Sequence, residues 1–466
     1  MLSGPCHQPY RVWTLRKIEN YLNKNSMKRF MFYIAFVASL GGLLFGFDTA
    51  VISGAEEAIQ QIYGLSGFWH GFTMAVALIG TCIGALCSTR PVEKFGRLLS
   101  LKTIALMYIV SALGCSLILN WYSFLFFRFI GGLAVGASSV AGPMYIAEIS
   151  PSNWRGRFVA FFQFNIVLGI VLAYVSNYLI KGVDNDWQWM IGVMAVPSTL
   201  FAVLLYSIPE SPRWLIKQGR EQDAYRIFEA TGEPDASGEV ANIRASLTAD
   251  VSNEPLFRRK YMKPVLFAFL IATFNQLSGI NTINYYAPRI FEIAGFGEDK
   301  MLNAILIGVT NLVFTMLGMV LIDLLGRKKL IYIGAVCMFV SLASVTRLFW
   351  LNDLSGSGLV LLISLMGFIA SFAISLGAVI WVLIAEVFPT GVRAKGQVLG
   401  SMTHWIWCSA LTWIFPVFVN ESGNFRDASY IFGFYALAVA GSFIFAWKLP
   451  ETKGKTLEQI QKELVK

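Results

Sequence analysis

The 466-residue chain is 56% hydrophobic and only 14% charged, whereas about a quarter of the residues of a soluble domain are charged. A soluble protein of this length could not bury so much apolar surface, so water-soluble classes are excluded and a lipid bilayer is the expected partner. The net charge of +9 does not indicate nucleic-acid binding, because the basic residues lie in short loops between long apolar stretches.

Residues 1–29 are predicted to form a cytoplasmic tail. They are rich in basic residues but lack an apolar core of the length that a signal peptide needs. Met27 directly precedes the first apolar stretch, so both Met1 and Met27 are candidate starts of translation. A weak amphipathic helix on the cytoplasmic side is the alternative interpretation of this segment.

Two sets of six apolar stretches follow, separated by a polar segment at 209–260. Many of them approach the roughly 20 residues that cross the hydrocarbon core as a helix. A closed β-barrel would instead show short alternating segments, which this sequence does not contain. We therefore expect an all-α membrane protein with twelve transmembrane helices. The stretches lie near 30–54, 69–90, 98–118, 122–145, 157–180 and 189–208, and then near 262–291, 301–324, 330–350, 358–387, 397–420 and 428–449.

The charged loops predict how these stretches are oriented. Basic residues cluster between stretches 2 and 3, 4 and 5, and 8 and 9, whereas the opposite loops are acidic or mixed, as at Glu56 and Glu57. The positive-inside rule therefore places both termini and segment 209–260 in the cytoplasm, and we expect a multi-pass protein of the bacterial inner (plasma) membrane. The expected units are the tail at 1–29, a six-helix bundle at 30–208, a linker of short surface helices (such as 221–229) at 209–260, a second bundle at 261–449 and a cytoplasmic tail at 450–466.

Three short motifs of the first half recur in the second half, in the same order and at nearly the same spacing. They are an acidic residue followed by x-x-Gly-Arg, the pattern A-E-x-x-P-x-x-x-R, and Pro-Glu followed by Ser or Thr. The preference of loops for Pro, Gly and Arg would explain one such match but not three. A duplicated six-helix unit is typical of carriers whose halves rock about a midplane site. The motifs begin at Glu93, Ala147 and Pro209, and again at Asp323, Ala385 and Pro450.

With these motifs in this order, the chain resembles the sugar porter family of the major facilitator superfamily over residues 30–460. The resemblance implies the major facilitator fold, with two six-helix pseudo-repeats, and alternating-access transport of a monosaccharide, either a pentose or a hexose. Bacterial sugar–proton symporters and facilitative glucose transporters are both similar to it. The matching positions are Arg128 with Gly131-Gly132; Tyr145, Glu148, Pro151, Arg155 and Gly156; 209–213; 276–286; Asp323 with Gly326-Arg327; 386–389 with Arg393; and 450–454.

Asp48 lies within the first apolar stretch. Inserting a charged side chain at the centre of a membrane helix costs about 2.5–3.5 kcal/mol of free energy on insertion scales, so the charged residues found there usually serve a transport pathway. A carboxyl subject to both desolvation and a neighbouring cation can load and release protons near physiological pH. Arg128 on the fourth stretch is the candidate cation. The resemblance implies that Asp48 couples the proton and that Arg128 is its partner; because facilitators carry Asn at this position, Asp favours symport. A fixed ion pair that only holds helices together is the alternative.

The seventh stretch carries an unusual number of amides and phenols between Asn275 and Tyr286. Amides suit a sugar, because both amides and sugar hydroxyls donate and accept hydrogen bonds. Gly279 and Pro288 would allow this helix to break or bend beside a cavity. The alternative is that the amides only hold helices together. The resemblance implies a sugar site made of Gln163, Gln276, Asn281, Tyr285, Asn311 and Trp381, the last of which follows Gly377 and offers an indole face and an N–H donor.

The sequence departs from the family pattern at three places. Asn275 stands where a glutamine is usual and is one methylene shorter, so we expect a less direct contact with the sugar. His404, which precedes Trp405, stands where relatives often carry Gln or Asn. It would bond the sugar, titrate, or pack as a neutral imidazole, and packing is our default expectation. The motif at 93–98 lacks a second arginine that is often present there, which would alter gating by that loop.

Acidic and basic residues recur at the predicted cytoplasmic ends of both halves. Exposed ion pairs are individually weak, but a network that forms only when the cytoplasmic side is closed would bias a two-state equilibrium. Signalling of topology by the arginines is a compatible alternative, although it does not explain the acidic partners. The candidate cytoplasmic gate consists of Glu93, Arg97, Glu148, Arg155, Asp323, Arg327, Glu386 and Arg393.

The sequence predicts neither an enzyme nor a cofactor site. It has no P-loop, so ATP is not the expected energy source, and the carboxylates near the membrane ends are separated by spanning helices rather than paired for glycoside hydrolysis. The six cysteines show neither zinc nor redox spacing, so no metal is expected. We expect a monomer that imports a monosaccharide with a proton. A proton-independent uniporter is the first alternative, and a sugar sensor, which would need a long signalling tail, is the second.

Overall fold

The computed structural model describes residues 24–117, 120–151, 154–248, 254–293, 300–351, 358–389, 392–420 and 425–449, together with the single residues 451, 453 and 464. Most of the two predicted tails therefore lies outside the described residues. The side chain of Asp323, predicted to belong to the cytoplasmic gate, lies outside them as well.

Twelve helical spans in the described part of the chain are long and apolar enough to cross a membrane, six before the polar segment and six after it. The predicted all-α class and the predicted number of spans are confirmed. The first six are α2 (Lys24–Ile62), α3 (Gly67–Phe95), α4 (Arg97–Leu117), α5 (Trp121–Ile149), α6 (Arg155–Ile180), and α7 (Asp186–Gly192) joined with α8 (Ala195–Leu204). The last six are α12 (Met262–Leu277) with α13 (Ile280–Ile293), α14 (Lys300–Leu325), α15 (Arg327–Leu351), α16 (Gly358–Ile374) with α17 (Leu376–Glu386), α18 (Arg393–Asn420) and α19 (Phe425–Lys448).

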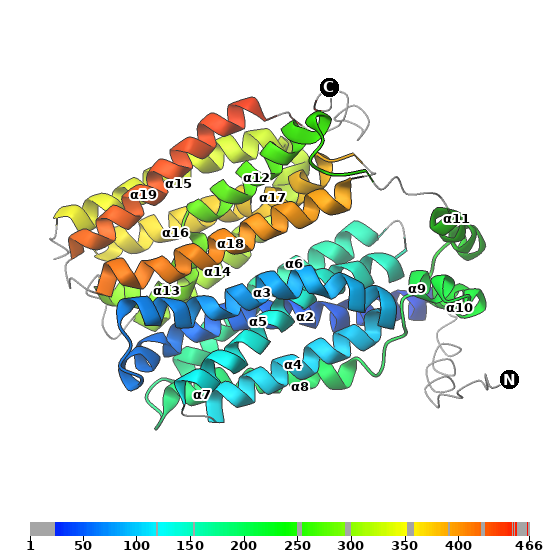
Figure 1. Ribbon diagram of the computed structural model, residues 1–466, viewed down its shortest axis with the longest axis horizontal. Coiled ribbons are helices and arrows are strands. Elements are labelled where there is room, and N and C mark those ends of the chain that lie inside the picture. Colours follow the sequence, from blue (N-terminus) through cyan, green and yellow to red (C-terminus); the bar gives the residue numbers. More distant parts are fainter. Residues whose placement is uncertain are drawn as a thin grey trace.

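The two sets of spans form two bundles that lie side by side, blue to green for the first and green to red for the second (Figure 1). Within the first bundle α2 packs on α6 and α3 on α5, and within the second α15 packs on α16 and α19. Across the bundles, α3 packs on α18 and α6 on α14. The midplane between these four helices is where a carrier of this architecture places its site.

Small residues allow the helices to approach closely. A Cβ atom built at Gly132 of α5 would lie 1.9 Å from the carbonyl oxygen of Ala77 on α3, and one at Gly136 would lie 2.1 Å from that of Thr81. In lipid, helices gain no hydrophobic stabilisation from contact with each other, so van der Waals contact at such positions holds them together.

The first span is longer than the sequence predicts. The apolar stretch ends near residue 54, but α2 continues to Ile62, so Glu56 lies in a helix and not in a loop. The extension is stabilised because it buries Ala55 and Ile59 among the neighbouring helices. Its polar residues therefore face other helices near one end of the bundle.

Two spans of the second bundle are interrupted within the membrane. Gly279, with φ +86°, separates α12 from α13, and Tyr286 departs from helical geometry two residues before Pro288. The break predicted at Gly279 and Pro288 is confirmed. A second break at Ser375 separates α16 from α17. Broken helices are tolerated at this depth where they are buried in protein or line a cavity, and they frequently form transporter binding sites.

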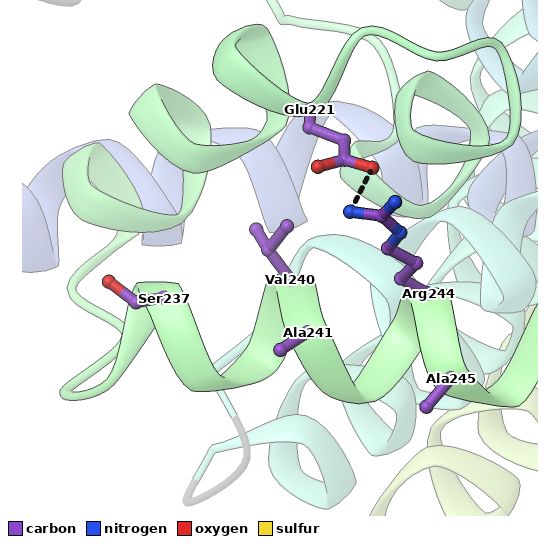
Figure 2. A pocket seen from close by; sticks show the side chains of 6 residues that line it. All are labelled: Glu221, Ser237, Val240, Ala241, Arg244 and Ala245. Carbon is purple, nitrogen blue, oxygen red and sulfur yellow. Dashed lines mark ion pairs between the residues drawn. The ribbon is translucent and has the colours of Figure 1, made fainter.

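Three short helices, α9 (Pro212–Lys217), α10 (Glu221–Thr231) and α11 (Ala236–Thr248), lie at one end of the bundles (Figure 1). The surface helix predicted at 221–229 is thus present as α10. Figure 2 shows an open groove on α10 and α11, across which Arg244 approaches Glu221 at 3.5 Å. We call this end of the molecule the linker end, and we call the opposite end, where α2 and α13 terminate, the far end.

Candidate functional site

Asp48 on α2 and Arg128 on α5 are paired inside the first bundle. Arg128 Nη1 donates to Asp48 Oδ1 at 2.8 Å, and both residues are about 2% exposed. The other two guanidinium nitrogens of Arg128, Nε and Nη2, have no hydrogen-bond partner among the described residues. A buried pair of opposite charges is costly to desolvate, and the attraction between the two charges offsets this cost only in part.

Gly131 leaves room for this pair. A Cβ atom built at Gly131 on α5 would lie 2.4 Å from Ser111 Oγ on α4 and 3.8 Å from Asp48 Oδ1. Ser111 is itself buried. The sequence shows Gly131 as part of a motif, but it does not single out Ser111, because a lone serine in an apolar helix has no pattern of its own.

The amides of the broken seventh span form a connected cluster. Gln276 Oε1 accepts from Asn281 Nδ2 at 2.8 Å, which bridges the break between α12 and α13. Gln276 Nε2 donates to Asn275 Oδ1 at 3.1 Å. Asn275 Nδ2 donates to the carbonyl oxygen of Leu376 at 3.1 Å, beside the break in the tenth span. Asn275 therefore connects the two breaks, and its amide nitrogen already donates a hydrogen bond within the protein.

His404 on α18 joins this cluster to two tryptophans. Its ring nitrogens lie 3.0 and 3.1 Å from Gln276 Nε2. Since an amide nitrogen donates, the ring nitrogen that accepts carries no proton, and His404 is neutral in this arrangement. Its ring centroid is 5.0 Å from that of Trp381 and 4.9 Å from that of Trp405. This geometry fits the packed, neutral imidazole better than a titrating group.

Trp381 and Tyr285 differ in their exposure. Trp381 on α17 is 39% exposed, whereas its neighbours His404 and Trp405 are buried, so part of the indole is accessible although its ring lies against that of His404. Tyr285 is almost completely buried and lies within electrostatic reach of Asp48 and Arg128. Tyr285 therefore brings the second bundle close to the charged pair of the first.

The remaining predicted sugar-site residues lie outside the cluster. Within the described part of the chain, neither Gln163, which is half-buried on α6, nor Asn311 on α14 is hydrogen-bonded to it. Asn311 Oδ1 instead accepts from Thr315 Oγ1 at 3.2 Å, one turn along its own helix. Gly377 is the second residue of α17, just beyond the break at Ser375, and a Cβ atom built there would lie 3.1 Å from the carbonyl oxygen of Phe372.

The charged residues at the linker end pair within each bundle. Arg97 donates to both carboxylate oxygens of Glu148 at 2.8 Å, a bidentate pair, and Arg327 Nη2 donates to Glu386 Oε1 at 3.1 Å. Arg155 approaches Glu239 of the linker at 3.5 Å. Two further members of the predicted gate contact neighbouring segments. Glu93 pairs with Lys217 at 3.7 Å, and Arg393 Nε donates to the carbonyl oxygen of Phe388 at 3.3 Å. The side chain of Asp323, the last member, lies outside the described residues.

Two glutamates repeat the same capping arrangement in the two bundles. Glu210 accepts from the backbone N–H groups of Arg97 and Leu98, at 3.0 and 3.1 Å, at the start of α4. Glu451 accepts from the backbone N–H groups of Arg327 and Lys328, both at 3.1 Å, at the start of α15. A carboxylate at a helix N-terminus is stabilising, because it satisfies free N–H groups and opposes the helix dipole. The Pro-Glu motifs of the sequence are therefore helix caps.

Replacing Glu210 by Ala should destabilise the purified protein by about 1–3 kcal/mol, because buried backbone donors lose their acceptor. Glu210→Gln should cost less, since the amide oxygen still accepts. Burial raises the pKa of Glu210 above 4.5, although the backbone donors oppose this. The folded protein therefore holds this proton more tightly than the unfolded chain, and the stability from this group falls as pH rises above about 4.5.

Thermal unfolding in detergent at several pH values measures both effects. Glu210→Gln should flatten the slope with pH, and Glu229→Ala, an exposed glutamate of α10, is the control that should change neither quantity. Equal unfolding temperatures for Glu210→Ala and Glu229→Ala would contradict the capping role.

Comparison with known proteins agrees with this architecture. The family described as "Sugar (and other) transporter" matches residues 34–464. The arabinose–proton symporter of Bacillus subtilis (strain 168) is 35% identical over 449 residues, which cover 94% of this chain and 96% of that protein. The inward-open structure of the xylose transporter XylE from E. coli has a TM-score of 0.82 at 33% identity and covers 93% of this chain and 100% of that one.

A second solved structure is also similar. The proton:xylose symporter XylE bound to 6-bromo-6-deoxy-D-glucose has a TM-score of 0.77 at 34% identity, covering 94% of this chain and 99% of that one. Matches of this extent confirm the predicted fold, with its two six-helix pseudo-repeats, and show a multi-pass membrane transporter rather than an enzyme. The chain therefore belongs to the sugar porter family of the major facilitator superfamily.

Proposed function

We propose that this sugar porter imports a pentose or a hexose together with a proton. The observation that carries the proposal is the buried Asp48–Arg128 pair, which places an ionisable carboxyl inside the first bundle, 2.8 Å from a cation. Ionisable residues within a membrane span usually mark an ion or proton pathway. A carboxyl in contact with a cation changes that contact when it takes up a proton, so this pair is suited to rearrange when its charge changes.

Protonation of Asp48 supplies the coupling. A proton on the carboxylate removes the negative charge that holds Arg128, so the guanidinium group turns to other acceptors. Tyr285, which lies within electrostatic reach of both residues, belongs to the second bundle. A proton bound in the first bundle thus changes the contacts between the bundles, and such a differential contact is what coupling between two sites requires.

The sugar binds where Gln276, Asn281, His404 and Trp381 meet. The amides offer both donors and acceptors to sugar hydroxyls, and the open face of Trp381 packs against the apolar face of the ring. The names of the relatives, an arabinose–proton symporter and a xylose transporter, support a small neutral sugar as the cargo. His404 orients Gln276 through the contact between their nitrogens.

We assign the linker end to the cytoplasm, because the basic loops lie there. The TM-score is higher for the inward-open form of XylE than for the form with a bound sugar analogue, which supports an arrangement with the linker end open. In this arrangement Arg97 pairs with Glu148 and Arg327 with Glu386, each within its own bundle. Closing the cytoplasmic side would bring these two pairs together as one gate.

Adding the transported sugar to de-energised cells that produce the protein should alkalinise a weakly buffered medium, because each imported sugar removes a proton from it. A pH electrode in the medium measures the effect, and cells that carry the vector alone are the control. Sugar uptake without alkalinisation would favour the proton-independent uniporter, and sugar binding without uptake would favour the sensor.

A further inference from the structure

The kink in α13 frees a backbone carbonyl. In an α-helix the carbonyl oxygen of each residue accepts from the N–H group four residues later. Pro288 has no N–H group, so the carbonyl oxygen of Asn284, four residues before it, loses its helical donor. Tyr286, between the two, departs from helical geometry with φ −119° and ψ 20°. Because Asn284 is buried, its carbonyl oxygen needs a donor from elsewhere in the protein.

Tyr174 on α6 supplies that donor from the other bundle. Its hydroxyl donates to the carbonyl oxygen of Asn284 at 2.7 Å, and the residue is 1% exposed. This distance is that of a well-formed hydrogen bond between two oxygens. The proline of the second bundle therefore creates a buried acceptor, and the tyrosine of the first bundle satisfies it.

Both sides of this contact are held in place. Asn177, one turn beyond Tyr174 on α6, donates from Nδ2 to the carbonyl oxygen of Val51 on α2 at 3.0 Å, which fixes α6 within the first bundle. The Tyr174 ring lies against Gly308 on α14, where a Cβ atom would lie 2.9 Å from the ring Cδ2. The ring is thus enclosed between the two bundles, and this packing directs its hydroxyl towards α13.

The bond lies in the half of the bundles that is nearer the far end. The helix α6 begins at Arg155, which contacts the linker, and ends at Ile180, so Tyr174 lies in its last two turns. When a carrier of this architecture opens towards the far end, its two bundles separate in this half. Opening there must therefore part the Tyr174 hydroxyl from the carbonyl oxygen of Asn284.

Charged side chains also join α13 to the first bundle, starting one residue beyond Pro288. Arg289 Nη1 donates to Glu56 Oε2 at 3.1 Å, and Arg289 Nη2 donates to Gln60 Oε1 at 2.8 Å, both on α2. Glu56 Oε2 also lies 2.7 Å from His70 Nε2 on α3. The helix α13 is therefore held against both α2 and α6 when the bundles touch at this end.

We infer that the Tyr174 hydroxyl and the carbonyl oxygen of Asn284 form a latch that holds the two bundles together at the far end. While this end is closed, the carbonyl is buried and Tyr174 satisfies it. When this end opens, the carbonyl oxygen faces the cavity between the bundles, and water replaces the hydroxyl. The same stretch of α13 carries Asn281 and Tyr285, so Tyr174 is a positioning residue that sets where α13 presents them to the first bundle.

The direction of its effect follows from the two end states. Tyr174→Phe keeps the ring against Gly308 and removes only the hydroxyl. In the closed state this leaves a buried carbonyl without its donor, whereas in the open state water serves as before. The variant should therefore raise the ratio of open to closed molecules by about three- to tenfold, the effect of one buried hydrogen bond.

Distances between spin labels on Ile62→Cys and Leu351→Cys measure this ratio, in full-length protein in nanodiscs whose native cysteines are replaced. Both labelled positions are exposed, at the far ends of α2 and α15. Tyr174→Phe should increase the fraction of long distances. Tyr178→Phe removes the hydroxyl of an exposed tyrosine one turn further along α6, and as the matched control it should behave like the parent.

Pro288→Ala tests whether the latch depends on the carbonyl that the proline frees. Alanine restores an N–H group for the carbonyl oxygen of Asn284, so the Tyr174 hydroxyl is no longer needed. In the Pro288→Ala background, Tyr174→Phe should therefore leave the ratio of open to closed molecules unchanged.

Three outcomes would overturn the inference. They are equal distance distributions for the parent and Tyr174→Phe, an equal shift in Tyr178→Phe, and a full effect of Tyr174→Phe in the Pro288→Ala background. If Pro288→Ala does not fold, the comparison of Tyr174→Phe with Tyr178→Phe decides alone. The measurement uses neither sugar nor a proton gradient, so its outcome is independent of the tests of the proposed function.

Discussion

Replacing Asp48 by Asn is expected to abolish uphill accumulation of sugar and to leave sugar binding and exchange in place. The amide has nearly the same shape as the carboxyl, and its oxygen can still accept from Arg128 Nη1, which now lies 2.8 Å from Asp48. It cannot take up a proton, so the proton gradient no longer drives the sugar. Proteoliposomes with an imposed pH gradient measure accumulation, and counterflow without a gradient measures exchange.

Two further variants show whether charge or shape is responsible. Asp186→Asn changes a partly exposed carboxylate that accepts from the backbone N–H of Gly182, and should accumulate sugar normally. Asp48→Ala removes the partner of Arg128 and leaves a buried charge uncompensated, which typically costs about 3–5 kcal/mol. Asp48→Ala should therefore lose stability as well as transport. Full accumulation by Asp48→Asn would refute proton coupling at this residue.

Much of the fold could be predicted because membranes allow few solutions. Hydropathy and length identify the twelve spans, since each backbone polar group must be satisfied within its own helix. Charged loops and repeated motifs indicate the duplication. The repeat is reproduced at the level of single contacts, since Glu210 and Glu451 cap equivalent helices in the two bundles. The sequence shows both glutamates, but the backbone groups that they bind become visible only in the fold.

The candidate site could be predicted in part. Asp48 is conspicuous because it is a charge within an apolar stretch, and its contact with Arg128 follows from the resemblance. The hydrogen bond that the Asn275 amide donates to the carbonyl oxygen of Leu376 could not be predicted, because it depends on two helix breaks that meet in space. The proposed roles of these residues in binding stay predictions.

The far end shows where sequence reasoning fails. Glu56 looks like a loop acid because the apolar pattern ends near residue 54, yet the helix continues and buries it. His70 and Arg289 have no motif. Arg289 meets Glu56 only because the two bundles are in contact, whereas His70 meets it through the packing of α3 beside α2 within the first bundle. Contacts between bundles join residues far apart in the chain, and no local periodicity reports them.

Replacing Gln276 by Ala is expected to weaken sugar binding by about 10–100-fold, or ~1.4–2.7 kcal/mol. Gln276 accepts from Asn281 and lies against His404, so its removal takes away a proposed partner of the sugar and leaves the Asn281 amide without its acceptor. An unpaired buried amide costs about 1–3 kcal/mol, which sets this range. Binding to purified protein, measured by competition among xylose, arabinose, glucose, galactose and inositol, tests it.

His404→Gln separates orientation from packing at the same site. Glutamine restores an amide beside Gln276 but removes the ring that packs between Trp381 and Trp405. If His404 serves mainly by packing, the variant should lower the unfolding temperature and weaken all five sugars alike. If its nitrogen sets the direction of the Gln276 amide, the order of preference among the sugars should change while stability falls little. If Gln276→Ala binds every sugar with unchanged affinity, the cluster is not the binding site. A sugar held by this cluster would contact the Gln276 amide at its centre, and losing that amide would weaken binding.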